Sequence, residues 1–211
     1  MQASDPTPRP LRLPGERGRL LDAFAHVAAA EGYERTTVSR VAQAADIDEE
    51  TFLRHFGSVE DCFVAAYELA IEQVTDRMYE AASGVQDPQE QLDRAVGSVL
   101  DTIAREPAFA RLCTVEAPAA GAAGLALRER TLRFFTEQLD QHRDRDEDHV
   151  PKLTAELVVG GLYETVRAHA RAGEVERLPE VMPHVRSFWL VPLVGERGSG
   201  PMGDDHRNGA A

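Results

Sequence analysis

The chain has 211 residues, of which 43% are hydrophobic and 28% charged, a normal globular balance with room for one domain or two small ones. Acidic residues number 36 against 23 basic ones, so the formal net charge is −13. This charge excludes a general nucleic-acid coat, which needs an excess of basic residues, but leaves open a site-specific DNA-binding protein with a small basic footprint. Two cysteines, Cys62 and Cys113, exclude a disulfide framework and a four-cysteine zinc site.

The two ends of the sequence differ from the rest of the chain. Residues 1–14 contain four prolines with Arg9 and Arg12, and we expect a disordered arm that either has no role or enters a DNA minor groove. Residues 195–211 are rich in glycine, and we expect a disordered tail there. The polar start is unlike a signal peptide, and no apolar run reaches the ~18 residues of a membrane helix. We therefore expect a cytoplasmic protein without a membrane partner.

Between these ends the hydrophobic spacing predicts an all-α protein. Thr36 or Thr37, Asp48 and Ser58 are expected to begin helices as N-terminal caps, whereas Gly32, in the left-handed conformation, and Gly173 are expected to end them. An alanine- and glycine-rich connection is expected at 118–124 and an acidic loop at 142–150. The predicted helices cover residues 16–30, 37–44, 48–56, 58–82, 88–104, 106–115, 125–141, 151–172 and 179–194.

Residues 37–56 are the most informative segment. Two short predicted helices joined by the three-residue turn Ala45–Ile47 form a helix-turn-helix. Ala42 is small where the two helices approach, and Asp46 stands where the turn requires a left-handed backbone, which aspartate tolerates better than most residues. On spacing alone, such a pair is either a DNA-reading unit or an ordinary helical hairpin.

Four stretches carry a resemblance to a known family: Gly32–Val38, Val41–Ala45, Thr51–Phe56 and Ser58–Asp61. Together they resemble the DNA-binding domain of the TetR family of bacterial transcriptional regulators, over about residues 16–67. The remainder is similar to that family only in its architecture. The resemblance implies an arm at 1–14, a helix-turn-helix DNA-binding domain at 15–60, a helical effector-binding and dimerisation domain at 61–194, and a tail at 195–211.

The resemblance further implies a homodimer that places the helix at 48–56 in the major groove of a double-stranded operator, with half-sites about one helical turn apart. Two positions depart from the family pattern: Leu53 replaces a usual tyrosine and Val59 a usual lysine. The positions that match the family's DNA contacts are Thr37, Ser39, Arg40, Glu49, Glu50, Thr51, Leu53, Arg54 and His55.

The expected reading head is slightly acidic. Residues 12–58 carry six arginines and eight carboxylates, a net charge of −2, so we expect few phosphate contacts in each half-site. Glu49 and Glu50 either accept a hydrogen bond from cytosine N4 or only stabilise the helix N-terminus beside the DNA. Arg54 is the best single candidate for a DNA contact.

The C-terminal part is expected to bind a small-molecule effector among its central helices. The candidate ligand-binding residues, each of which is equally compatible with an ordinary core or surface position, are Tyr67, Phe109, Cys113, Glu116, Phe134 and Tyr163. Their apolar majority predicts a hydrophobic or amphipathic ligand, and Glu116 could orient a polar group on it. The dimer is expected to form through residues 152–172 and 179–194, where Gly160 and Gly161 permit close backbone approach.

No pattern in the chain predicts a catalytic centre, a metal site or a cofactor. The acidic stretch at 142–149 lacks the glycine and glutamate that a calcium-binding loop requires. The sequence therefore predicts a transcriptional regulator, most simply a repressor that a small molecule releases from a palindromic operator. Two alternatives stay open: a helical binding protein or enzyme in which the helix-turn-helix is only structural, and a transcriptional activator.

Overall fold

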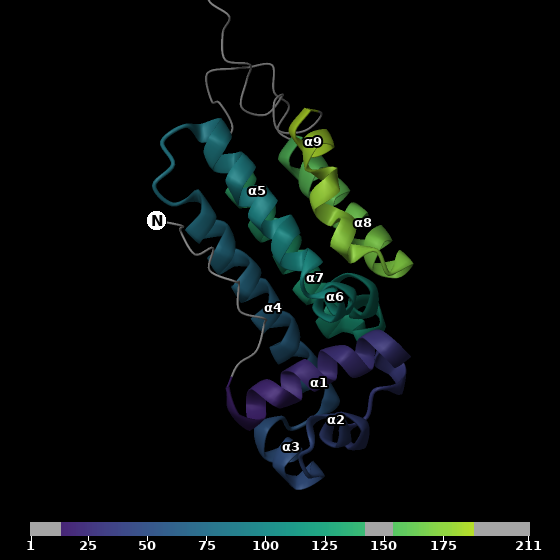
Figure 1. Ribbon diagram of the computed structural model, residues 1–211. Helices are drawn as coiled ribbons and strands as arrows, with labels where there is room; N and C mark the ends of the chain where they lie inside the picture. Colours follow the sequence, from purple (N-terminus) through teal and green to yellow (C-terminus); the bar gives the residue numbers. More distant parts are fainter. Residues whose placement is uncertain (1–13, 142–153, 188–211) are drawn as a thin grey trace, which may run out of the picture.

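The computed structural model describes residues 14–141 and 154–187, and all regular structure in these two stretches is helical. Helices α1–α3 form a small unit at one end of the molecule, and helices α4–α9 form a bundle above it (Figure 1). The α-helices are α1 (Gly15–Glu31), α2 (Val38–Ala45), α3 (Glu49–His55), α4 (Val59–Ala82), α5 (Pro88–Ala104), α6 (Pro107–Arg111), α7 (Gly121–Asp140), α8 (Thr154–Ala172) and α9 (Met182–Val185).

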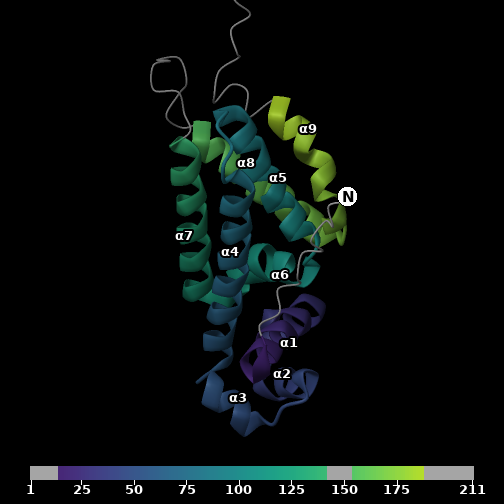
Figure 2. The ribbon, with the colours of Figure 1, turned by 60° about the vertical axis from the view of Figure 1, so that its left-hand side comes forward.

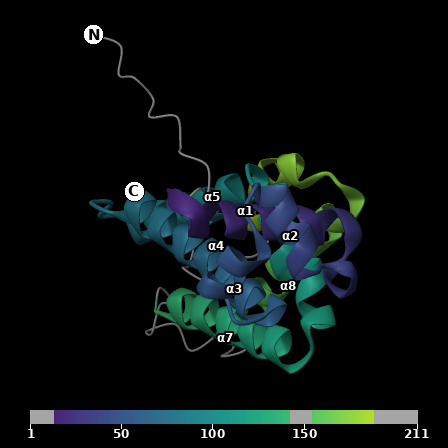
Figure 3. The ribbon, with the colours of Figure 1, turned by 90° about the horizontal axis from the view of Figure 1, so that it is seen from below.

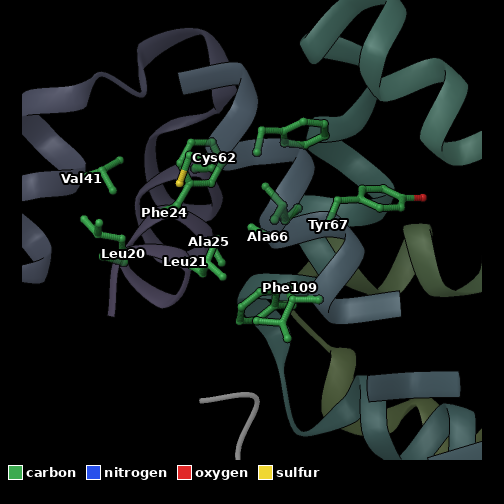
Figure 4. Packing of buried hydrophobic residues seen from close by; sticks show 14 of the residues in the cluster. Leu20, Leu21, Phe24, Ala25, Val41, Cys62, Ala66, Tyr67 and Phe109 are labelled. Atoms are coloured by element: carbon green, nitrogen blue, oxygen red, sulfur yellow. The ribbon is translucent and has the colours of Figure 1, made fainter. Parts of the chain in front are cut away.

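A hydrophobic core joins the small unit to the bundle. Phe24 of α1, Val41 of α2 and Phe52 of α3 are fully buried, and they share this core with Cys62 and Phe63 of α4. Figure 4 shows Phe24 and Cys62 close together, with Tyr67 on the side of the cluster that faces the bundle. The core continues into the bundle through Phe109, Leu112, Cys113, Ala117, Ala120 and Leu127.

Helix α4 belongs to both parts of the molecule. Its first turns complete the core of the small unit, and its 24 residues extend about 36 Å at 1.5 Å per residue. It runs side by side with α5, and α7 lies on its other side (Figure 2). The expected boundary at residues 60 and 61 therefore falls inside one continuous helix, and any movement of α4 within the bundle moves part of the core of the small unit.

Most expected helices are present with nearly the expected bounds, but three segments differ. Residues 118–124 are not an irregular connection, because they belong to the 3₁₀ turn Ala117–Ala120 and to the first turn of α7. The helix expected at 106–115 ends at Arg111 and continues as a wider π-helical turn, Leu112–Glu116. The segment before α9 is a 3₁₀ helix, Val175–Val181, rather than the start of an α-helix at 179.

Two glycines occupy positions that other residues would not fit, one because of a close contact and one because of its backbone conformation. Gly124 lies where α7 touches the preceding 3₁₀ turn, and a Cβ atom there would stand 1.8 Å from the carbonyl oxygen of Ala117. Gly32 ends α1 with φ 90° and ψ 150°, so its φ is positive as expected but its ψ is not that of the left-handed helix. Such a backbone is almost restricted to glycine.

Parts of the expected organisation lie outside the described residues. These parts are the arm with Arg9 and Arg12, the acidic loop at 142–150, residues 151–153 and 188–194 of two expected helices, and the tail at 195–211. Within residues 14–141 and 154–187, no helix is long and apolar enough to span a bilayer.

Candidate functional site

The turn between α2 and α3 has the geometry of a helix-turn-helix. Asp46 adopts the left-handed conformation, with φ 53° and ψ 53°, and its backbone N–H donates to carbonyl groups in the last turn of α2. Ile47 N–H donates to the carbonyl of Ala42 at 3.0 Å. Thr37 caps α2 by accepting a bond from Arg40 N–H at 3.3 Å. The expected helix cap at Thr37 and the expected left-handed residue at Asp46 are confirmed.

Asp48 and Thr51 lock the first turn of α3. Asp48 accepts bonds from the Thr51 N–H at 2.7 Å and from the Thr51 hydroxyl at 2.9 Å. These bonds stabilise the carboxylate, so the pKa of Asp48 lies below its ordinary value of 3.8. Thr51 is only 4% exposed, and its hydroxyl accepts a bond from Arg54. The structure therefore places Thr51 inside the unit, where it orients Arg54, and not on the outer face with the other candidate DNA contacts.

The remaining eight candidate DNA contacts lie on the exposed face of α2 and α3. This face consists of Thr37, Ser39, Arg40, Glu49, Glu50, Leu53, Arg54 and His55, all exposed, and we call it the reading face. It lies at the free end of the molecule, and the view from below in Figure 3 shows α2 and α3 there. Leu53 is 52% exposed despite its apolar side chain.

Basic side chains on and beside the reading face contact neighbouring side chains. Arg40 forms an ion pair with Glu31 at the end of α1, and His55 lies 3.3 Å from Glu16 at its beginning. Arg17 lies over the ring of Phe56 at 5.3 Å. Sequence reasoning missed Glu16 and Glu31 because they lie on α1, and only the crossing of α1 over α2 and α3 brings them to this surface. Glu31 and Glu16 therefore place carboxylates directly against Arg40 and His55.

The bundle contains an elongated cavity of about 330 Å³ between α4, α5, α6, α7 and α8. Its lining residues on α4 extend from Tyr67 to Ala82, a distance of about 22 Å along a helix. The walls are mostly apolar, with Ile71, Val74 and Met78 on one side and Leu132, Phe135 and Val159 on the other. The volume is in the range of small-molecule sites.

Four of the six candidate ligand-binding residues line this cavity, namely Tyr67, Phe109, Cys113 and Tyr163. Phe134 and Glu116 are not among its lining residues. The lining positions on α7 are Thr131, Leu132, Phe135, Gln138 and Leu139, and Phe134 lies beside that stripe, with its ring against Phe135. Sequence reasoning missed the polar lining residues Thr102, Thr114 and Thr131, because helical spacing gives a buried face but not which helix lies opposite it.

Polar groups gather at the end of the cavity nearest the small unit. The Tyr67 hydroxyl donates to Thr131 Oγ1 at 3.2 Å, and the Tyr163 hydroxyl donates to the carbonyl of Thr114 at 3.3 Å. Burial raises the pKa of both phenols, so both stay neutral donors near pH 7. Figure 4 shows the Tyr67 hydroxyl pointing away from the hydrophobic cluster. We call Tyr67 and Tyr163 the phenol pair, and Thr131 and Thr114 their hydrogen-bond partners.

Glu116 joins the wall of the cavity to the small unit. It ends the π-helical turn that carries Cys113 and Thr114, and its side chain points to α1 instead of into the cavity. Glu116 Oε2 accepts a bond from the backbone N–H of Tyr33 at 3.0 Å, and Oε1 lies 3.2 Å from Arg111. Glu116 is 7% exposed. A buried carboxylate thus fixes the end of α1 to the turn that borders the cavity.

The comparisons with known proteins agree with this geometry. The family model described as "Bacterial regulatory proteins, tetR family" matches residues 20–66. The HTH-type transcriptional repressor KstR of Mycolicibacterium smegmatis is 25% identical over 166 residues, which cover 76% of this chain and 81% of that protein. Among solved structures, the fatty acid degradation regulator FadR of Bacillus halodurans has a TM-score of 0.74 at 19% identity, covering 88% of this chain and 98% of that one. FadR of Bacillus subtilis, solved with stearoyl-CoA, has a TM-score of 0.72 at 18% identity, covering 82% and 97%.

A helix-turn-helix with an exposed second helix, attached to a helical bundle with a cavity, defines a class of DNA-binding regulatory proteins. The match to the family model includes α2, the left-handed turn and α3, and the fold of the whole described chain is that of the FadR structures. Residues 20–66 therefore form a DNA-binding domain of the TetR family of bacterial transcriptional regulators.

Proposed function

We propose that this protein is a ligand-responsive repressor that binds a palindromic operator as a homodimer and is released by a small apolar molecule. The observation that carries the proposal is the contact between Glu116 and Tyr33, because it connects the turn beside the cavity with the unit that bears the reading face. KstR is named a transcriptional repressor, and one FadR structure contains stearoyl-CoA. Both names support a repressor with an apolar effector.

The reading face is proposed to enter the major groove with α3. Arg54 and Arg40 are its arginines, and Leu53 would contact apolar groups such as the methyl group of thymine. Glu49 and Glu50 are placed at the N-terminus of α3, where they either accept from cytosine N4 or stabilise the helix. With so few cations, the slope of log K against log salt concentration should be shallower than about −8.

The homodimer is proposed to form through residues 152–172, which include α8, and residues 179–194, which include α9. Leu157 on α8 is 73% exposed, an apolar side chain without cover in the isolated chain. Gly160, one turn further, has open space where a Cβ atom would stand. Glycines cost helix stability, and the open surface around Leu157 and Gly160 favours close approach by a second copy of α8. A twofold interface suits a palindromic operator.

The proposed mechanism is a shift between two states of the dimer. An effector in the cavity would move the π-helical turn Leu112–Glu116, and Glu116 would transmit the movement to the end of α1. The two reading faces would then have a spacing that mismatches the operator, and DNA affinity would fall. π-Helical turns within helices recur at functional sites.

The experiment that tests the proposal compares the wild type with the double variant Arg40→Ala, Arg54→Ala. Operator affinity is measured by fluorescence anisotropy on DNA selected with the wild-type protein, and stability by thermal unfolding. The proposal predicts at least a tenfold loss of affinity with an unchanged melting temperature. If the helix-turn-helix is only structural, as in a helical binding protein or enzyme, the wild type itself selects no DNA.

A transcriptional activator is the second candidate, since it would use the same reading face and cavity. A reporter driven by the selected operator in its own promoter context separates the two. Deletion of the regulator should raise expression from that promoter if the protein is a repressor, and should lower it if the protein is an activator.

A further inference from the structure

The cavity differs in polarity along its length. Its outer end is bordered by Tyr79, which is 49% exposed, and by Gln91 and Gln141. Its middle is apolar, and its inner end holds the phenol pair with Thr131 and Thr114. A molecule that fills this cavity lengthwise would meet apolar walls first and hydrogen-bonding groups at its buried end.

The phenols at the inner end have hydrogen-bonding capacity to spare. Their bonds, at 3.2 Å for Tyr67 and 3.3 Å for Tyr163, are longer than the 2.5–3.0 Å usual for hydroxyl donors. A bond of that length is weak, so each hydroxyl can turn to a better acceptor without losing much. A ligand oxygen between the two rings would receive shorter bonds in surroundings where hydrogen bonds are strong.

The lining of the inner end favours an uncharged head group. Among the described residues, no cation lines the cavity. Arg128 lies outside the lining, 4.7 Å from the centre of the Tyr163 ring, and its positive charge partly opposes the rise in the pKa of both phenols. A ligand carboxylate buried here would lose its hydration without a direct contact to a cation of the lining, whereas an uncharged oxygen loses less on burial.

We propose that the phenol pair is the head-group subsite of the effector cavity and selects an elongated apolar molecule whose buried end carries an uncharged oxygen acceptor, a ketone or an alcohol. The inference rests on the proposed function in that it takes the cavity to be the effector site. It adds the orientation of the ligand, head group inward against Tyr67 and Tyr163, and the chemical class of that head group.

The location of this subsite brings the head group close to the π-helical turn Leu112–Glu116. Tyr163 donates to the carbonyl of Thr114, which lies in the same π-helical turn as Glu116. When the Tyr163 hydroxyl turns to the ligand, that carbonyl loses its side-chain donor. The head group would therefore act on the element that holds the end of α1.

The test uses ten-carbon probes that differ only at one end: 1-decanol, 2-decanone, 1-chlorodecane and decanoate. Their affinities are measured at pH 8, where decanoate is ionised, by displacement of an apolar fluorophore from the wild-type protein. We expect 1-decanol and 2-decanone to bind at least tenfold more tightly than decanoate. Equal or tighter binding of decanoate, or no binding by any probe up to its solubility limit, would overturn the proposal.

Two conservative variants and a matched control locate the subsite. Tyr67→Phe and Tyr163→Phe should each weaken binding of 1-decanol and 2-decanone by about fivefold, the usual worth of one hydrogen bond, and leave 1-chlorodecane unchanged. Tyr79→Phe removes a phenol hydroxyl at the outer end and should leave all four affinities unchanged. An equal loss in Tyr79→Phe, or no loss in either inner variant, contradicts the assignment.

These measurements need no DNA, so their outcome is separate from that of the proposed function. If the probes behave as expected and the protein selects no operator, the subsite stands and the repressor does not. If the protein binds an operator but decanoate is the preferred probe, the head-group assignment fails while the regulator stands.

Discussion

The Glu116 carboxylate accepts the backbone N–H of Tyr33 at 3.0 Å, although 83 positions separate the two residues. Glu116 ends the turn beside the cavity, and Tyr33 follows the glycine that ends α1. The Tyr33 ring also lies edge-on against Phe63 of α4, with ring centres 5.3 Å apart. Through these two contacts, Tyr33 joins three elements: the wall of the cavity, the end of α1 and the start of α4.

Replacement of Glu116 should lower the free energy of unfolding and weaken the effect of a bound ligand on operator affinity. Glu116→Ala leaves the Tyr33 N–H without its acceptor and Arg111 without its ion pair, and we expect the free energy of unfolding to fall by about 1–3 kcal/mol. The effect of 1-decanol on operator affinity should become smaller than in the wild type. Urea unfolding and anisotropy titrations measure the two effects.

Glu68→Ala is the matched control for Glu116→Ala. Glu68 forms an exposed ion pair with Arg130, and such pairs contribute less than about 1 kcal/mol. Its loss should leave the response to 1-decanol unchanged. A full response in Glu116→Ala would rule out the proposed route through the Tyr33 contact.

Release of Arg40 from its intramolecular partner should strengthen DNA binding. Glu31→Gln removes the carboxylate that pairs with Arg40 and one negative charge beside the reading face. We expect operator affinity to rise about two- to fivefold, as the loss of an exposed ion pair permits. Glu129→Gln, which breaks a comparable exposed pair with Arg133 on α7, should not alter affinity. An unchanged or lower affinity in Glu31→Gln would show that the pair does not compete with phosphate.

The cap of α3 should lose its contribution to stability in acid. The pKa of Asp48 is below its ordinary value of 3.8, so its carboxylate stabilises the folded state above that pH, and the stabilisation disappears as the pH falls through the folded pKa. The difference in melting temperature between the wild type and Asp48→Ala should be constant from pH 7 to 5 and shrink below pH 4. The Asp48→Asn variant keeps a side-chain acceptor that does not titrate, so its difference from Asp48→Ala should not change with pH.

The close contact at Gly124 should make this position intolerant of even one methyl group. Gly124→Ala would bring a Cβ to 1.8 Å from the Ala117 carbonyl oxygen, and the backbone must shift at a cost of about 1–3 kcal/mol. Gly97→Ala, in a stretch of α5 with open space around the site, should instead stabilise the protein by up to about 1 kcal/mol. Chemical unfolding of both variants tests this difference, and equal effects would contradict the described packing.

The sequence was most informative where local chemistry determines structure. Thr37, Asp48 and Ser58 cap the helices that follow them, as predicted, because capping depends on residues three positions apart. The left-handed turn at Asp46 was predictable for the same reason. The connection expected at 118–124 was wrong, because this segment is a 3₁₀ turn and the start of α7. Gly124 there packs against the carbonyl of Ala117, a contact that composition alone does not predict.

The site was less predictable because it depends on which helices meet. Apolar spacing identified Tyr67, Phe109, Cys113 and Tyr163, which do line the cavity. The spacing could not separate these four residues from Phe134. Phe134 is next to the lining residue Phe135 on α7 but does not itself line the cavity. Nor could it assign Glu116 to Tyr33, since nothing local in either segment indicates a partner 83 positions away.

Binding of a specific DNA sequence by the reading face is tested by selecting the purified protein against random double-stranded DNA and measuring anisotropy on the enriched sequence. We expect an enriched palindrome with half-sites about one helical turn apart, bound at least about a thousandfold more tightly than random DNA. Recovery of no common sequence, or equal affinity for enriched and random DNA, would contradict it.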